Sequence, residues 1–255
     1  MEIEILGAHM TEITNAKPTA LVIDGVLALD AGSLCSSLPL PAQQKLKALL
    51  LTHQHYDHVR DIPAIAMNLS YQGVLQVYSI PPVFEILSTH LLNGKMYPNF
   101  LKWPEHQPAV KFIPIEPYQL TNISGYSVLA VLVPHGVPTV GFQVASPEGK
   151  KVFYTGDTTV GVSACWEYVS PDLLITELSL PQGMEEWAKK TGHLTPGLLK
   201  VELLQFRQVK GYIPSTILIH INPTLESEIE GEVAQVAQEL GANIALGQEG
   251  MKIQL

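Results

Sequence analysis

The most informative stretch of the sequence reads Thr52-His53-Gln54-His55-Tyr56-Asp57-His58 and follows an apolar run, residues 48–52, that predicts a strand buried on both faces. In an extended segment the first two histidines point the same way and can bind one metal ion. Asp57 and His58 lie past the bend and can face a second ion. Histidine nitrogens and carboxylate oxygens suit Zn²⁺, Mn²⁺ or Fe. The alternative is a polar surface loop that happens to be rich in histidine.

Three further ligand-type residues each follow another apolar run. They are His135 in VLVPHG, Asp157 in VFYTGDT and His220 in TILIH. Taken singly, each is typical of an ordinary capping or hydrogen-bonded residue. Together they repeat one pattern, a strand that ends in a ligand. Because strand ends in α/β folds converge at one edge of a sheet, we expect these residues to lie near the first cluster.

Hydrophobic periodicity predicts strands and helices that alternate in two similar halves. The predicted strands are Glu2–Leu6, Ala20–Ile23, Val26–Leu29, Ala48–Thr52, Val74–Tyr78, Tyr126–Val133, Val140–Ala145, Lys151–Tyr154, Leu173–Thr176, Thr216–Ile219, Ile244–Leu246 and Met251–Leu255. The predicted helices are Ile62–Leu69, Pro82–Leu92, Pro196–Phe206 and Glu226–Leu240. Asp24–Gly25 is a hairpin dipeptide. No polar linker divides the chain, so residues 1–255 are predicted to form one α/β domain with two central sheets and helices outside.

Composition restricts the class of partner. The formal net charge is −9, and Lys and Arg are scattered rather than gathered in a basic stripe. Proteins that grip a long nucleic acid usually offset the phosphate charge with such a stripe. An acidic protein can still bind a small phosphate ester where metal ions supply the positive charge. The charge pattern therefore favours a small-molecule substrate.

Two features bear on location. The N-terminus lacks a basic start followed by a long apolar run, and no stretch is apolar enough to span a bilayer. Cys35 and Cys165 are too few and too far apart for a disulfide framework or a metal site, so they are predicted to be reduced, partly buried thiols. These features predict a cytoplasmic protein without a membrane partner.

The order H-x-H-x-D-H, then a lone His, a Gly-Asp and a late His after a strand resembles the metallo-β-lactamase superfamily along nearly the whole chain. The resemblance implies an αββα sandwich, with two mixed sheets flanked by helices and a dinuclear site at one edge. It implies that His53, His55 and His135 hold one ion, that Asp57, His58 and His220 hold the other, and that Asp157 bridges both. Asp30, in LALDAG, matches a position that supports the ligands in this superfamily; the alternative is a turn-forming Asp before Gly.

Three segments indicate a branch of this superfamily. Asp30–Leu34, Ser88–Phe100 and Gly192–Pro196 resemble the class II cyclic-nucleotide phosphodiesterases. The last segment also resembles the His-Ser-Thr loop of the tRNase Z-like endonucleases, in which a Glu at the place of Glu177 pairs with the loop histidine. Against the endonucleases, Tyr56 stands where they usually have Gly, and no basic arm is present. The phosphodiesterases tend to be longer than this chain.

The expected reaction is hydrolysis of a phosphodiester by a metal-bridging hydroxide, with two divalent ions, Zn²⁺ first and Mn²⁺ or Fe as alternatives. The leaving alkoxide needs a proton, for which His193 is the predicted general acid, held protonated by Glu177. With Asp57 these are the predicted catalytic residues. The alternative for His193 is a solvated loop residue beside Thr195, which would cap the following helix.

The leading hypothesis is therefore a hydrolase of 3′,5′-cyclic nucleotides (cAMP or cGMP) or a similar small phosphodiester. The rivals are a tRNase Z-like RNA-processing nuclease, a mononuclear iron dioxygenase of the same fold, and a non-catalytic binding module, which would normally have lost ligands. By analogy with the fold, the chain could form a homodimer.

The segment Gly94–Pro117 carries five prolines, is predicted to be irregular and is the candidate lid over the base. Its aromatics Tyr97, Phe100 and Trp103 either stack on a purine or pack within the protein. His9, His90 and His106 have no comparable support and are predicted to be surface or packing residues, with His90 a candidate for the pocket wall.

Overall fold

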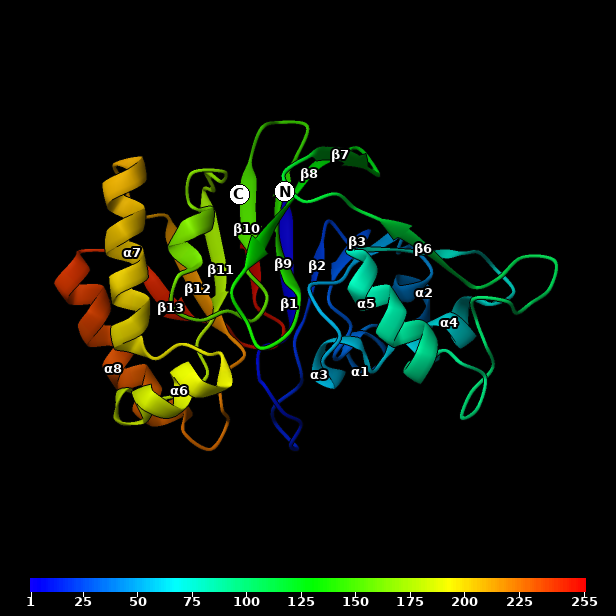
Figure 1. Cartoon of the computed structure of the whole chain (residues 1–255), viewed down its shortest axis with the longest axis horizontal. Helices are drawn as coiled ribbons and strands as arrows, with labels where there is room; N and C mark the ends of the chain where they lie inside the picture. The colour runs from blue at the N-terminus through cyan, green and yellow to red at the C-terminus, as the bar shows by residue number, and fades with distance from the viewer.

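The computed structural model describes residues 1–255 as two seven-stranded mixed sheets in the middle of the molecule, with helices on both outer sides (Figure 1). The predicted α/β sandwich is thereby confirmed. Helices α4 and α5 lie on the side of the first sheet, whereas α6, α7 and α8 lie on the side of the second. None of the helices combines the length and apolar character that a bilayer crossing requires.

The first sheet has the strand order β14-β1-β2-β3-β4-β5-β6. Its strands, in chain order, are Glu2–Gly7, Ala20–Ile23, Leu27–Leu29, Ala48–Leu50, Leu75–Ser79, Val110–Pro114 and, as β14, Lys252–Gln254. Pairing is antiparallel from β14 to β3 and parallel from β3 to β6. Asp24 and Gly25 both have positive φ, as a two-residue hairpin turn requires, so the predicted turn between β2 and β3 is confirmed.

The second sheet has the order β13-β12-β11-β10-β9-β8-β7. Its strands β7 to β13 are Leu120–Ile123, Tyr126–Val133, Thr139–Ala145, Lys151–Tyr154, Leu173–Glu177, Ser215–Ile219 and Ile244–Leu246. Pairing is antiparallel from β7 to β10 and parallel from β10 to β13. Each sheet thus has an antiparallel part and a parallel part.

The helices bury apolar stripes against the sheets. The helices α1 to α8 are Leu34–Ser37, Leu40–Gln43, Tyr56–Val59, Ile62–Leu69, Pro81–Ile86, Glu185–Thr191, Pro196–Lys210 and Glu226–Leu240. The buried side chains of α8 are Ile229, Val233, Val236 and Leu240, a spacing of three or four residues that keeps one face of the helix toward the sheet. A second apolar layer therefore lies outside the second sheet, separate from the larger core that contains residues of both sheets.

One part of the sequence prediction is wrong, and a second is correct only as a helix of two kinds. The segment Gly94–Pro117 is not irregular throughout, because Val110–Pro114 forms the edge strand β6 beside β5. An edge strand tolerates a proline, so Pro114 did not exclude it. The predicted helix Pro82–Leu92 is α5 followed by a π-helical turn, Leu87–Leu91. Strand β7 and helix α6 had not been predicted.

Candidate metal centre

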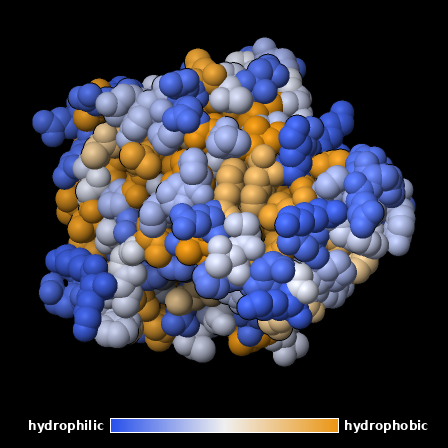
Figure 2. All heavy atoms as spheres, turned by 45° about the vertical axis from the view of Figure 1, so that its right-hand side comes forward, coloured by the Kyte–Doolittle hydropathy of each residue, from blue (hydrophilic) through white to orange (hydrophobic).

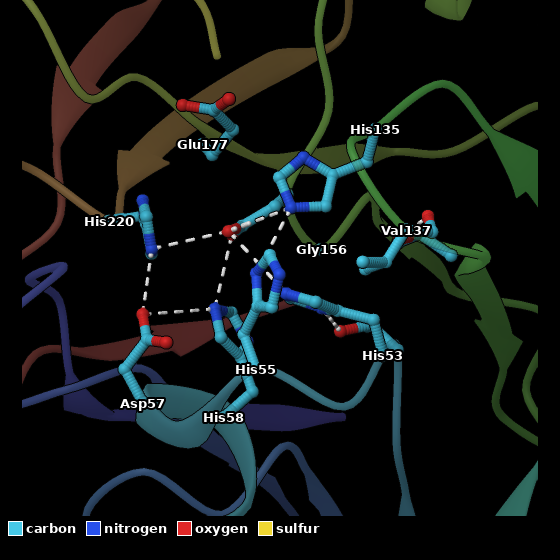
Figure 3. A network of polar contacts seen from close by, with 12 residues as sticks. His53, His55, Asp57, His58, His135, Val137, Gly156, Glu177 and His220 are labelled. Atoms are coloured by element: carbon cyan, nitrogen blue, oxygen red, sulfur yellow. Dashed lines mark hydrogen bonds and ion pairs between the residues drawn. The ribbon is translucent and has the colours of Figure 1, made fainter. Parts of the chain in front are cut away.

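The predicted ligands come together at one edge of the two sheets. They follow the ends of β4, β8, β10 and β12, and α3 begins within the first cluster. Figure 3 shows the imidazoles of His53, His55, His58, His135 and His220 turned toward one another, with the Asp57 carboxylate beside His58 and His220. The seven predicted ligands form two groups whose ligand atoms lie within 4.8 Å of one another: His53, His55, His135 and Asp157; and Asp57, His58 and His220. All seven predicted metal ligands therefore occupy one site.

The carboxylate of Asp157 lies between the two groups. Its Oδ2 is 3.6 Å from Nε2 of His53 and 3.7 Å from Nε2 of His135. The same oxygen is 3.3 Å from Nε2 of His220, and Oδ1 is 3.2 Å from Nε2 of His58. Asp157 is therefore placed to contact an ion in either group, as expected for a bridging ligand.

The second group closes around Asp57. Its Oδ2 is 3.0 Å from Nε2 of His220 and 3.5 Å from Nε2 of His58. Burial opposes the charged carboxylate, but His58 and His220 outweigh it and lower the pKa of Asp57 to about 2. Asp57 is thus ionised and able to bind a cation.

The residues present fit a pair of divalent cations. Nε2 of His53, Nε2 of His58 and Oδ1 of Asp157 are buried and make no hydrogen bond, an arrangement that costs free energy unless another partner is present. Burial also lowers the pKa of His53, His55 and His135, which keeps these imidazoles neutral. Neutral imidazoles and carboxylates without a cysteine form a donor set that divalent transition metals and zinc accept.

Asp30 supports one candidate ligand of each group, His53 and His58, from behind. Its Oδ2 accepts hydrogen bonds from Nδ1 of His58 at 2.8 Å, from Oγ1 of Thr52 at 2.8 Å and from the hydroxyl of Tyr154 at 2.7 Å. Oγ1 of Thr52 is in turn 2.9 Å from Nδ1 of His53. Asp30 is fully buried and has a φ of 55°, a left-handed conformation that is uncommon for a residue with a Cβ. These contacts give Asp30 a supporting place and not only a turn-forming one.

A close approach of two loops sets the position of Asp157. Gly156 has a φ of 64°, and a Cβ added to it would lie 2.7 Å from Cβ of Thr52. Only glycine therefore lets the loop after β10 pack against the start of the His-rich motif.

His193 and Glu177, predicted as a pair, lie together beside the second group. Nδ1 of His193 is 3.2 Å from Oε1 of Glu177, which also accepts a hydrogen bond from the backbone N–H of Leu194. The His193 ring stacks on that of His220 with centroids 5.3 Å apart. Although burial opposes the charged imidazole, Glu177 outweighs it and raises the pKa of His193 to about 9. The His193 side chain is only 14% exposed, which argues against a solvated loop residue.

The loop that carries His193 is anchored on both sides. Nδ1 of His135 is 2.9 Å from the carbonyl oxygen of Gly192, and the hydroxyl of Thr159 donates to the carbonyl of His193. Thr195 also caps α7 through Leu198, so the capping role and the pairing of His193 coexist. The sequence had not singled out Ser179, whose hydroxyl lies between Glu177 and His220. Its place two residues after Glu177 was the only available signal.

The aromatics of the predicted lid have separate positions. Phe100 is fully buried, and Trp103 packs edge-on against it, so both have the packing role. Tyr97 contacts Phe100 and is 42% exposed. None of the three lines the cavity beside the His-rich motif.

That cavity, of about 280 Å³, adjoins the residues between the ligands. Its wall includes Gln54 and Tyr56 of the His-rich motif, His90 of the π-helical turn, and Met96. In Figure 2 the side of the molecule that carries α4 and α5 comes forward, and hydrophobic residues on this face are bordered by hydrophilic ones. Tyr56 is 70% exposed, which is unusual for so large a ring next to a polar cluster. His90 thus has the predicted place in a pocket wall.

The other singled-out residues lie away from the centre. His9 is buried, with Nδ1 2.7 Å from Glu249 and Nε2 3.4 Å from Glu226, and is a packing residue. Cys35 and Cys165 are free, as predicted, and burial raises the pKa of each thiol to about 12.

With the site in place, the comparisons with known proteins identify the family. A family model described as the beta-lactamase superfamily domain matches residues 19–221, and the chain belongs to this metallo-β-lactamase superfamily of hydrolases. The chain is 22% identical to a ribonuclease Z of Methanosarcina acetivorans over 94% of its length and 93% of that protein. It also resembles the structure of unliganded yeast PDE1, with a TM-score of 0.84, 16% identity and coverage of 100% of this chain and 99% of that one. The short form of human tRNase Z gives a TM-score of 0.70 at 17% identity, covering 100% of this chain and 99% of that one.

Proposed function

We propose that this hydrolase is a dinuclear metal-dependent phosphodiesterase and that its substrate is a 3′,5′-cyclic nucleotide. The observation that carries the proposal is the position of the Glu177–His193 pair. Ligand-type atoms of Asp157, His193 and His220 lie within 4.8 Å of one another, so a candidate proton donor is placed directly beside the candidate metal centre.

The two groups would each hold one ion, Zn²⁺ being the first candidate and Mn²⁺ or Fe the alternatives. His53, His55 and His135 would bind one ion, Asp57, His58 and His220 the other, and Asp157 both. Two such ions supply a nucleophilic water at neutral pH and stabilise negative charge on the phosphate oxygens.

The chain itself supplies the proton for the leaving group. Nδ1 of His193 faces the Glu177 carboxylate, which leaves Nε2 free to donate a proton to the departing ribose oxygen. The raised pKa of His193 keeps the ring protonated at neutral pH. Glu177 orients the ring and favours its charged form, but it does not need to touch the substrate.

Three observations support a small cyclic nucleotide. Three segments of the chain, Asp30–Leu34, Ser88–Phe100 and Gly192–Pro196, resemble those of class II cyclic-nucleotide phosphodiesterases. The net charge of −9 is unfavourable for a long polyanion. The cavity beside Tyr56, Met96 and His90 offers apolar walls for a base.

A second candidate function is processing of RNA 3′ ends. The observation that favours it is the similarity to the ribonuclease Z of Methanosarcina acetivorans over nearly the full length of both proteins. The Glu177–His193 pair suits both reactions, because each releases an alkoxide that needs a proton.

The deciding experiment gives the same metal-loaded protein both substrates. Metal-stripped protein is reconstituted with Zn²⁺ or Mn²⁺ and assayed with 3′,5′-cyclic AMP and with a precursor tRNA carrying a 3′ trailer. Metal-dependent release of 5′-AMP is the expected result. Cleavage of the precursor alone, by protein with two bound ions, contradicts the cyclic-nucleotide proposal and supports the second function. One bound iron and no phosphodiester cleavage supports the dioxygenase.

A further inference from the structure

The hydroxyl of Ser179 occupies the junction between the metal centre and the proton donor. Oγ of Ser179 is 2.8 Å from Nδ1 of His220 and 2.8 Å from Oε2 of Glu177. The same Oγ is 3.3 Å from Nδ1 of His193. Ser179 is fully buried, so no water competes for these contacts.

The direction of these hydrogen bonds follows from the chemistry of the imidazole. Nε2 of His220 faces Asp57 and Asp157, with which it would share an ion; when that ion is bound, Nε2 offers its lone pair and Nδ1 carries the proton. Nδ1–H therefore donates to Oγ of Ser179. A hydroxyl has one hydrogen, which Ser179 then donates to the Glu177 carboxylate.

We infer that Ser179 is a positioning residue that lets the single Glu177 carboxylate hold both the metal-facing tautomer of His220 and the proton-donating His193. Oε2 of Glu177 acts on His220 through the serine hydroxyl, whereas Oε1 acts on His193 directly. His220 has a φ of 61°, a left-handed conformation that needs support from its surroundings. The charge on Glu177 polarises the serine hydroxyl and makes Nε2 of His220 a better electron-pair donor to a cation.

Metal affinity tests this inference without any substrate. It rests on the metal groups of the proposed function, but a chain that binds two ions and hydrolyses no cyclic nucleotide would refute that function and leave the inference intact. Binding of Zn²⁺ to metal-stripped protein is measured by competition with a chelator, which resolves the two ions. Ser179→Ala is expected to weaken binding of the ion held by Asp57, His58 and His220 about 10- to 100-fold and to leave binding of the other ion unchanged. Excess Zn²⁺ restores occupancy.

Glu177→Gln is the decisive partner variant, because Glu177 contacts no metal ligand directly. Glu177→Gln is expected to weaken binding of the same ion. The effect should disappear in the Ser179→Ala background, since both changes interrupt one chain of hydrogen bonds. His193→Ala is expected to bind both ions normally. The matched control is Thr176→Val, which removes a buried hydroxyl three residues before Ser179, in β11, that bonds only to Thr155.

Three results would overturn the inference. The first is normal binding of both ions by Ser179→Ala. The second is an effect of Glu177→Gln that adds fully to that of Ser179→Ala, which would mean separate routes. The third is an equal loss of metal affinity in Thr176→Val, which would show a general response to the loss of a buried hydroxyl in this segment.

Discussion

Asp30 and Glu177 each build one half of the site, and these halves are not the two metal groups: Asp30 supports His53 and His58, whereas Glu177 supports His193 and His220. Each carboxylate reaches a metal-facing histidine through a hydroxyl: Asp30 through Thr52, Glu177 through Ser179. Asp30 also accepts hydrogen bonds from a second candidate ligand, His58, and from the hydroxyl of Tyr154. Glu177 uses its other oxygen for His193, which is not among the predicted metal ligands.

The difference indicates a division of labour within the site. In the half built on Asp30, the side chains of Asp30, Thr52, His53 and His58 are all buried and serve only to hold candidate ligands. The half built on Glu177 includes a histidine, His193, whose side chain is 14% exposed, so under the proposed function this half would both bind an ion and deliver a proton to substrate. Substitutions in the two halves should therefore fail in different ways.

The largest effect is expected where the two metal groups share a ligand. Asp157→Asn removes the charge from the one carboxylate that faces both groups, so both ions should bind more weakly and phosphodiesterase activity should fall to background. Metal content by elemental analysis and turnover of cyclic AMP measure the two losses. Full metal content in this variant would contradict the shared position of Asp157.

Asp30→Asn should be the strongest destabilising change in the half of the site built on Asp30. The neutral amide cannot accept from Thr52, His58 and Tyr154 together, so a buried donor is left unpaired. A loss of about 3–5 kcal/mol is expected from urea unfolding of the metal-free protein. Glu177→Gln, measured in parallel, should lose less, because its carboxylate holds fewer buried side chains. Equal losses would erase the distinction between the halves.

Thr52→Val tests whether the two hydroxyls act alike. The variant is nearly isosteric and removes the link from Asp30 to His53. It should weaken the ion held by His53, His55 and His135 about 10- to 100-fold, which is the opposite ion from that affected by Ser179→Ala. Chelator competition on both variants makes the comparison; loss of the same ion in both would contradict it.

The smallest effect concerns an ion pair outside the site, between His9 and Glu249. Burial opposes the charge, but His9 and backbone N–H groups lower the pKa of Glu249 to about 2, and the pKa of His9 is raised by Glu249 and Glu226. Because the pKa of Glu249 is lower in the folded protein, its charge stabilises the fold at pH values above the pKa of the unfolded chain. This contribution is lost as pH falls toward about 2. The raised pKa of His9 contributes at low pH and is lost as pH rises through its folded value.

Glu249→Gln should therefore cost most at about pH 5 to 6, where both groups are charged, by about 1–2 kcal/mol. The difference from the unchanged protein should shrink toward pH 2. Urea midpoints across this range provide the measurement, and a constant difference would mean that the charge of Glu249 is irrelevant.

The seven candidate ligands were predicted from a repeated local pattern, an apolar strand followed by His or Asp, and from the family resemblance, and the structure brings them together because strand ends converge. Asp30 was predicted from the resemblance of LALDAG, although its reach to His53 through Thr52 needed the structure. Ser179 escaped notice because a serine two residues after Glu177 has no pattern of its own; its meaning comes from His220, 41 residues away.

The edges of the fold were harder to predict than its middle. Strands β3 and β4 are buried on both faces and appear as short apolar runs, whereas β7 has the burial pattern of an exposed edge strand. Strand β6 also lies at an edge, where Pro114 is tolerated, so the prolines of Gly94–Pro117 misled the prediction. The aromatics of that segment could not be assigned from sequence, because packing and stacking favour the same residue types.

The central claim is that the half built on Glu177 delivers a proton to the leaving group, and its most direct test compares two substrates in His193→Ala. Cyclic AMP releases an alkoxide that needs the proton, whereas bis(p-nitrophenyl) phosphate releases a phenolate that does not. The account predicts that the variant, with both ions bound, hydrolyses cyclic AMP about 10²- to 10⁴-fold more slowly and the nitrophenyl ester at nearly the unchanged rate. Equal losses on both substrates would contradict it.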